Sequence, residues 1–156
     1  MQKYKKPDIN ESKIGINPFT VSLVIEVNKN VIPNAYKQED GIWVQATIEQ
    51  EVTPFVKVYR TVEHRKVISS LSGPAMKLLE HVRNTVECGC DYLWINKERF
   101  MEENSMSLNT YKKAIQQLCL VSILYKMVNY DYYWINPDYF FFGSRVKKYP
   151  NKVIEK

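Results

Sequence analysis

Hydrophobic and polar positions separate most cleanly in Ser107–Leu118 (SLNTYKKAIQQL). At 100° per residue the apolar side chains of this segment fall within an arc of about 120°, which predicts an amphipathic helix. They are Leu108, Tyr111, Ala114, Ile115 and Leu118. The opposite side holds only amide, hydroxyl and ammonium groups, from Asn109, Thr110, Lys112, Lys113, Gln116 and Gln117. Such groups reach base edges and phosphates in the DNA major groove, and no acid interrupts them, so this face is a candidate DNA-contacting surface.

The pattern on both sides of this helix predicts a helix-turn-helix followed by a hairpin. Two further helices are predicted before it, at Ser72–Val86 and Lys97–Asn104, with a short strand at Tyr92–Asn96 between them. After it come two β-rich runs separated by a turn at Asn129–Asp131, namely Val121–Val128 and Tyr132–Asn136. This order is that of a winged helix-turn-helix, in which the third helix docks in the major groove and the hairpin, or wing, lies over the flanking backbone.

The N-terminal half is predicted to form an antiparallel sheet. Apolar residues alternate with polar ones in Phe19–Val27, and two more strands are expected at Ile42–Glu49 and Phe55–Val62. Asn28–Asp40 contains Pro33 and lacks periodicity, so we expect a loop there. The predicted fold class is therefore α+β, an N-terminal antiparallel β-sheet followed by a winged helix-turn-helix.

Four regions follow from these patterns. Residues 1–13 form a basic arm, expected to be mobile, and residues 14–65 form the β region. Residues 66–148 form the winged-helix domain, and residues 149–156 form a basic, solvated tail. At the end of the wing, Tyr139, Phe140 and Phe141 should pack back onto the domain. Since three consecutive side chains cannot share one side of a strand, at least one ring should be exposed or contact a partner.

Composition and charge narrow the class of protein. With 45% hydrophobic and 25% charged residues among 156, the chain is globular, and its apolar runs are too short to span a membrane. The N-terminus lacks a secretory signal, which favours a cytoplasmic location. A net charge of +5 allows a nucleic-acid partner. Four cations near the wing therefore join the candidate DNA contacts, namely Lys126, Arg145, Lys147 and Lys148.

No constellation of residues indicates catalysis, a metal or a cofactor. Three cysteines argue against a disulfide framework, and Cys88-Gly89-Cys90 lacks a usual zinc spacing. A tyrosine that nicks DNA would need a metal held by closely spaced histidines. His64 and His81 are seventeen positions apart, so those ligands are missing. We expect a non-enzymatic protein with reduced cysteines and no metal.

Three segments resemble the winged-helix replication initiators of bacterial plasmids. They are Phe55–Val62 (FVKVYRTV), Leu71–Val82 (LSGPAMKLLEHV) and Tyr132–Arg145 (YYWINPDYFFFGSR). The most specific part is Ile135-Asn136-Pro137 with Tyr139, Phe140 and Gly143, and the resemblance covers roughly residues 55–148. It implies sequence-specific binding of double-stranded DNA at a replication origin and recruitment of replication machinery.

Two alternatives about partners remain open at this point. The winged helix could instead serve as a protein-interaction module in a structural or assembly protein, for example of a phage particle, which would place the chain in a virion. The predicted N-terminal sheet has long edges with few charges, which favours a homodimer through that sheet. A strand from a different protein of a large assembly would cover the same edge.

Overall fold

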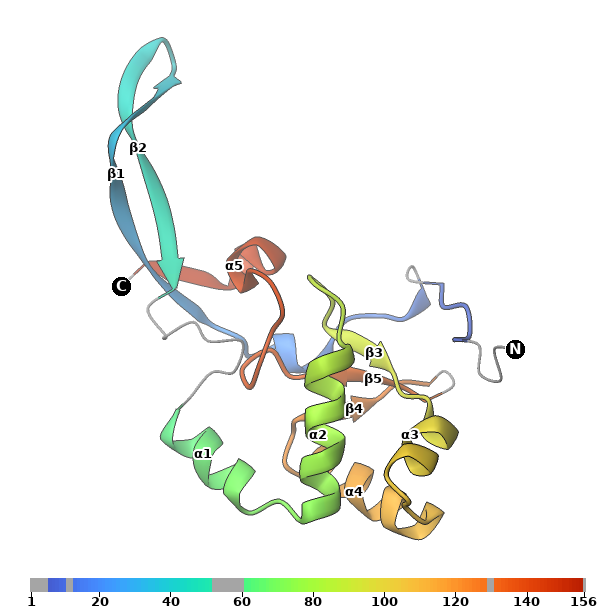
Figure 1. Cartoon of the computed structure of the whole chain (residues 1–156). Helices are drawn as coiled ribbons and strands as arrows, with labels where there is room; N and C mark the ends of the chain where they lie inside the picture. The colour runs from blue at the N-terminus through green and yellow to red at the C-terminus, as the bar shows by residue number, and fades with distance from the viewer. Residues whose placement is uncertain (1–5, 11–12, 52–60, 129–130, 156) are drawn as a thin grey trace.

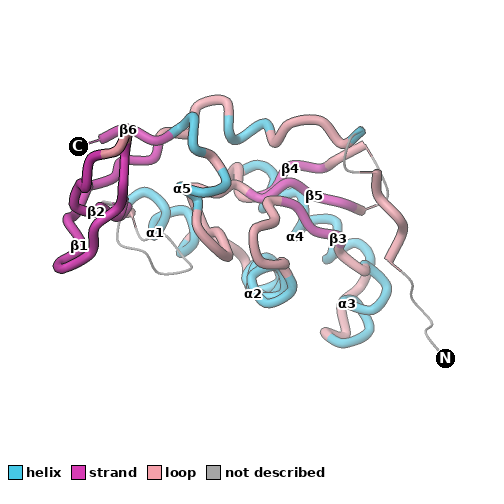
Figure 2. Tube along the Cα trace, turned by 90° about the horizontal axis from the view of Figure 1, so that it is seen from above, coloured by secondary structure: helices cyan, strands magenta, loops and turns pink. Residues whose placement is uncertain are grey.

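The computed structural model describes residues 6–10, 13–51, 61–128 and 131–155. Within them the chain combines α-helices with small β-sheets, as expected for a mixed class: five α-helices and two three-stranded sheets (Figure 1). Figure 2 shows a long β-hairpin at one end of the molecule and a helical body at the other. No helix in the described part of the chain is long and apolar enough to cross a membrane.

The body contains the helices and strands that the hydrophobic pattern predicts around residue 110. The helices are α2 (Gly73–Thr85), α3 (Lys97–Glu103) and α4 (Leu108–Leu120). The strands are β3 (Tyr92–Trp94), β4 (Leu124–Lys126) and β5 (Tyr132–Ile135), which pair antiparallel in the order β3-β5-β4. The main core lies between these helices and the sheet. Its most deeply buried members are Ala75, Leu78, Val82, Ile95, Leu118 and Ile123.

Each of the three helices begins where a polar side chain caps it. Ser72 accepts a hydrogen bond from the amide of Ala75, and Pro74 sits in the first turn, where it loses no helical hydrogen bond. Asn96 and Ser107 cap α3 and α4 in the same way. Between α3 and α4 the chain turns at Ser105, whose φ is 49°. Local capping chemistry therefore explains why these boundaries agree with the prediction.

The helix α1 (Val62–Ser69) was not predicted. Residues 52–60 lie outside the described residues, so most of the predicted strand Phe55–Val62 is not tested. Its last residue is helical, because the Thr61 hydroxyl accepts from the amide of His64 and caps α1. This helix has no fully buried residue, and Val67 and Ile68 are only partly buried against the core. A weakly amphipathic pattern of this kind gives little sequence signal.

The N-terminal sheet differs from the prediction. Among the described residues it has only two antiparallel strands, β1 (Ile25–Glu39) and β2 (Ile42–Glu51), and β6 (Val153–Glu155) pairs with β1 in parallel. The predicted loop at Asn28–Asp40 is wrong, because β1 runs through it and Pro33 falls at a shift of register.

The ends of the first two predicted strands also shift. The predicted strand Phe19–Val27 begins late, because Pro18–Thr20 is a short 3-10 helix, η2, capped by Asn17. At the far end of β1, Asp40 and Gly41 both have positive φ, at 49° and 78°. This is the backbone that a two-residue hairpin turn requires, which explains why β1 and β2 form one hairpin.

The β1–β2 hairpin projects from the body (Figure 1), and a small buried cluster lies at its base. Leu23, Ile25 and Val27 are buried there, against partly buried residues of the C-terminal segment. Those are Val146, Tyr149 and Val153. Further along the hairpin, Tyr36, Ile42 and Trp43 are 62%, 68% and 68% exposed. These three apolar side chains near the turn of the hairpin are therefore mostly exposed to solvent.

Parts of both predicted tails are ordered on the body. In the predicted basic arm, Ile9 packs against the buried cluster of Met127, Tyr132 and Trp134, and the Tyr132 hydroxyl donates to the carbonyl of Pro7 over 2.7 Å. The predicted solvated tail forms η3 (Pro150–Lys152) and then β6. Pairing with β1 gives the backbone groups of this charged segment hydrogen-bond partners, and the sequence pattern did not predict this pairing.

The three aromatic residues Tyr139, Phe140 and Phe141 are all buried, so the expectation that one of these rings is exposed was wrong. Tyr139, Phe140 and Phe141 are 8%, 3% and 2% exposed. The alternation argument fails because this segment turns instead of running as a strand. Tyr139 stacks on His64, with ring centroids 4.1 Å apart, and Phe141 lies 6.0 Å from Tyr149.

We expect stability to fall at alkaline pH because of buried phenols. Burial raises the pKa of Tyr133 to about 12, and the Asp131 carboxylate adds to this effect. An unfolded tyrosine has a pKa near 10, so the folded state holds this proton more tightly. Its contribution is constant below about pH 10 and is lost at about 1.4 kcal/mol per pH unit between about 10 and 12. Urea unfolding across that range measures the slope, which Tyr133→Phe should reduce. An unchanged slope in that variant would contradict the assignment.

Candidate nucleic-acid interface

The polar face of α4 is open to solvent over most of its length. Tyr111, Ala114 and Leu118 are buried in the core on the opposite side of the helix. Four of the six candidate side chains are exposed, namely Asn109, Lys112, Lys113 and Gln116. They project from consecutive turns of one rigid element, as direct contact with the edges of bases requires.

The other two candidates on α4 have structural partners. The Thr110 hydroxyl lies 2.9 Å from the Ser107 hydroxyl, within the helix cap. The Gln117 side-chain oxygen accepts from the amide and the hydroxyl of Ser72, at 3.1 and 2.8 Å. Gln117 thereby joins α4 to the first turn of α2. Sequence spacing placed both residues on the polar face but could not show these contacts.

The β4–β5 hairpin adds one candidate cation beside α4. Lys126 is exposed, and its ammonium is near enough to the Cys119 thiol to lower that pKa, although burial dominates and raises it overall. Cys119 and Lys112 are two helical turns apart, so they share one flank of α4. Lys126 therefore lies toward the flank that carries Lys112.

Two exposed apolar residues of this hairpin were not among the candidates. Tyr125 is 55% exposed, and Val128 is fully exposed next to the turn. The strand pattern alone could not identify them, because both lie in a β-rich run whose other members, such as Leu124 and Met127, are buried.

Arg145 is not a surface cation, contrary to the prediction. Its side chain is 5% exposed and donates to the Pro137 carbonyl over 2.9 Å and to the Asp138 carboxylate over 3.2 Å. A guanidinium can satisfy several acceptors in the interior through its fork of donors, which explains this placement. It holds the turn after β5 and presents no charge to a ligand.

Lys147 and Lys148 are exposed but belong to α5 (Arg145–Lys148). Figure 1 shows α5 on the other side of the β3-β5-β4 sheet from α4. The Lys148 ammonium lies 4.0 Å from the Asp91 carboxylate. The structure therefore does not bring these two lysines together with the polar face of α4.

The motif that carries the plasmid-initiator resemblance has structural roles here. The Asn136 amide donates to the Ser122 carbonyl over 2.8 Å, and its oxygen accepts from the amide of Asp138, which fixes the turn after β5. Gly143 has a φ of 124°, and a Cβ there would lie 3.3 Å from the amide nitrogen of Gly89. Gly143 thus permits a close approach of two chain segments.

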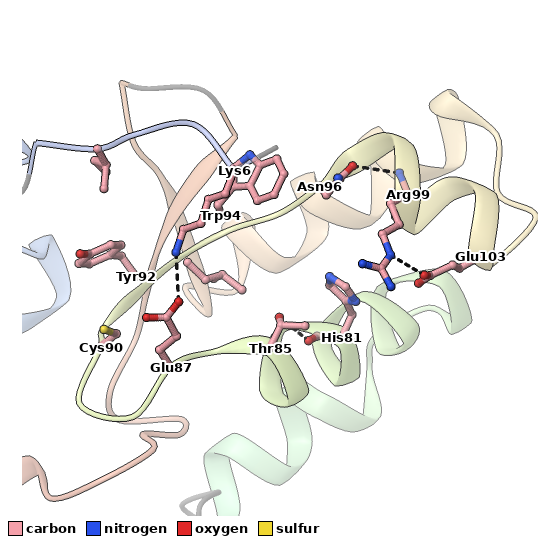
Figure 3. A pocket seen from close by; sticks show the side chains of 12 residues that line it. Lys6, His81, Thr85, Glu87, Cys90, Tyr92, Trp94, Asn96, Arg99 and Glu103 are labelled. Carbon is pink, nitrogen blue, oxygen red and sulfur yellow. Dashed lines mark hydrogen bonds and ion pairs between the residues drawn. The ribbon is translucent and has the colours of Figure 1, made fainter. Parts of the chain in front are cut away.

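A groove of about 530 Å³ lies between α2, β3, α3 and the N-terminal segment (Figure 3). Most of its charged groups face one another. Lys6 pairs with Glu87 at 3.1 Å, and Arg99 pairs with Glu103 at 2.7 Å. His81 is half-buried against the Phe100 ring, and burial lowers its pKa. The Lys6–Glu87 pair joins the N-terminal segment to the residues after α2, whereas the Arg99–Glu103 pair lies within α3. Both pairs leave little net charge in the groove to attract a ligand.

In the described part of the chain, no three His, Cys, Asp or Glu side chains are placed so that they could hold a metal ion. Cys88 is exposed, Cys90 is partly buried, and neither forms a disulfide. No protein-family model matches the chain, and no curated protein and no solved structure matches it significantly.

Proposed function

We propose that residues 73–135 form a winged helix-turn-helix that binds double-stranded DNA without a catalytic step of its own. The observation that carries this proposal is the exposed, acid-free polar face of α4 with Asn109, Lys112, Lys113 and Gln116. The element order α2, β3, α3, α4, β4, β5 supports it, since the helix after the turn is the one that enters the groove.

Each side chain on this face has a chemical role in the proposal. Asn109 and Gln116 carry amides, which can pair with adenine through two hydrogen bonds. Lys112 and Lys113 carry positive charge for guanine edges or phosphates. Lys126 on the proposed wing would contact the backbone beside the groove. The interface thereby combines sequence-reading and phosphate-binding groups on rigid elements.

The biological role that we propose is that of a replication initiator. It rests on the resemblance of residues 55–148 to plasmid initiators, in which origin binding recruits replication machinery. The structural roles of Asn136 and Gly143 explain why such a motif would accompany the fold. Asn136 and Gly143 would have the same structural roles whether or not the bound DNA is a replication origin.

The proposal is tested by fluorescence anisotropy with mixed double-stranded DNA across a salt series. We expect affinity to fall steeply with salt. If Lys112 and Lys113 both contact phosphate, replacing both by alanine should reduce the slope of log K against log salt by about two, at about 0.9 per contact. If Lys113 instead reads a guanine, Lys113→Ala should cost about 1–3 kcal/mol on the preferred sequence.

A matched control removes the same charge elsewhere. Lys29 and Lys37 lie on the β1–β2 hairpin, in exposed ion pairs with Glu155 and Glu39. The Lys29→Ala/Lys37→Ala variant should bind DNA almost as the wild type does. Equal losses in both double variants would indicate a general charge effect, and unchanged binding in Lys112→Ala/Lys113→Ala would reject α4 as the interface.

A second candidate function, an assembly protein that uses this domain for protein contacts, is favoured by one observation on α4. Leu120 lies at the end of the polar face and is 77% exposed, an apolar group that contributes nothing to phosphate binding. The exposed apolar side chains on the projecting hairpin also favour a role in protein contacts. Absence of DNA binding even at low salt would favour this function over the first.

A further inference from the structure

The outer edge of β2 has an unusual composition for a free strand. In the order β2-β1-β6, β2 is an edge strand, and no other described strand pairs with its outer side. Monomeric proteins protect such edges with lysine, proline or bulges. Residues 42–48 (IWVQATI) contain no charged residue and no proline. This sequence is typical of a strand that pairs on both sides.

One face of the same hairpin is also free of charge near the turn. The register places Tyr36 opposite Gln45 and Gln38 opposite Trp43, and cross-strand partners share a face. The other face carries Lys37 and Glu39, and the Lys37 ammonium lies 2.6 Å from the Glu39 carboxylate. The uncharged face presents two exposed aromatic rings, so both the edge and this face suit burial against protein.

The geometry of the β1–β2 hairpin is a second reason to expect a partner along the outer edge of β2. Among the described strands, β6 pairs only with residues 25–27 of β1, so beyond its base the hairpin is a two-stranded ribbon. Two-stranded ribbons alone are marginally stable in water, and three or more strands are needed for independent stability. The ten residues of β2 span about 34 Å, which is long for an unsupported edge.

We propose that β2 pairs antiparallel with β2 of a second copy of the chain, across a two-fold axis near Gln45. This register places Val44 opposite the partner's Ala46 and Trp43 opposite the partner's Thr47. No charged side chain is opposed within residues 42–48, so the edge is compatible with itself. The result is a six-stranded sheet in the order β6-β1-β2-β2-β1-β6, with two bodies at its ends.

Charge argues against DNA as the occupant of the hairpin. Residues 25–51 contain five acids and two lysines, whereas the whole chain carries +5. DNA phosphates repel an acidic hairpin, so the hairpin remains available for a protein contact while α4 contacts DNA as proposed. Two-fold pairing suits a DNA-binding role, because it would present two α4 helices to two half-sites. The pairing itself does not depend on DNA binding.

The test measures the mass of the full chain in the absence of DNA, by sedimentation equilibrium at tens of micromolar. We expect a dimer. Gln45→Lys and Gln45→Glu each place two like charges across the axis and should raise the dissociation constant at least about fivefold. Mixing the two variants should restore the dimer, since a lysine then faces a glutamate. Circular dichroism checks that each variant is folded.

Gln38→Lys is the matched control, because Gln38 lies on the same face but on β1, one strand away from the edge. It should weaken the dimer much less than Gln45→Lys. A monomeric wild type would overturn the proposal and leave a strand of another protein as the cover. Equal effects of the two lysine variants, or no restoration on mixing, would also overturn it. DNA titration of the same samples is a separate readout, so failure of either proposal is recognised independently.

Discussion

Replacing Phe140 by alanine is expected to destabilise the protein by about 3–5 kcal/mol. The ring is 3% exposed and belongs to the main core, so its loss removes buried apolar area and leaves a cavity. The Arg83 guanidinium lies 5.8 Å from the ring centroid, and a cation over an aromatic face adds stabilisation that alanine cannot supply. Urea unfolding monitored by circular dichroism measures the change in the free energy of unfolding.

Phe142 provides the comparison for this substitution. It is two residues away and only partly buried against the same core. Phe142→Ala should therefore cost clearly less than Phe140→Ala, since its ring already contacts solvent in the folded state. A smaller effect at Phe140 than at Phe142 would mean that the two rings are placed on the wrong sides of the chain.

The elements of the body were predictable because their signals are local. Ser72, Asn96 and Ser107 each cap the helix that follows, and these hydrogen bonds depend on residues three apart in sequence. The buried stripe of α4 likewise follows from helical spacing. For the same reason the exposure of Lys112 and Lys113 could be predicted from sequence.

The N-terminal sheet was predicted poorly because its pairing is non-local or interrupted. The shift of register at Pro33 breaks the alternation of β1, so the segment resembles a loop. Asp40-Gly41 is a strong hairpin signal that would have joined β1 to β2. In contrast, no sequence pattern shows that residues 153–155 pair with residues 25–27, more than a hundred positions earlier.

Charge alone selected candidate cations that the structure does not bring together on one surface. Arg145 has the same formal charge as Lys113, yet its guanidinium is buried between Pro137 and Asp138. Lys147 and Lys148 follow it in sequence but lie on α5, away from α4. Which cations share a surface depends on tertiary packing, and composition contains no information about that.

The same tertiary packing produces a buried polar cluster where the N- and C-terminal segments meet the small sheet. The Asp91 carboxylate accepts hydrogen bonds from the Asn17 amide over 3.0 Å and from the Tyr149 hydroxyl over 2.7 Å. The Asn17 amide also donates to the carbonyl of Ile135. Burial, with a further contribution from Asp91, raises the pKa of Tyr149, so its hydroxyl remains a donor. One carboxylate thereby joins three parts of the chain.

Asp91→Ala is expected to cost about 2–6 kcal/mol of folding free energy, because it removes the acceptor of one Asn17 N–H and that of the partly buried Tyr149 hydroxyl, at about 1–3 kcal/mol each. Thermal or urea unfolding measures the loss. The neighbouring acid Glu87 is the control: its ion pair with Lys6 is exposed, so Glu87→Ala should change stability by less than about 0.5 kcal/mol. If the protein binds DNA through α4 as proposed, the DNA affinity of folded Asp91→Ala protein should remain near that of the wild type, since the hydrogen bonds of the Asp91 carboxylate to Asn17 and Tyr149 involve no residue of α4. Equal stability of the two variants would show that Asn17 and Tyr149 find other acceptors.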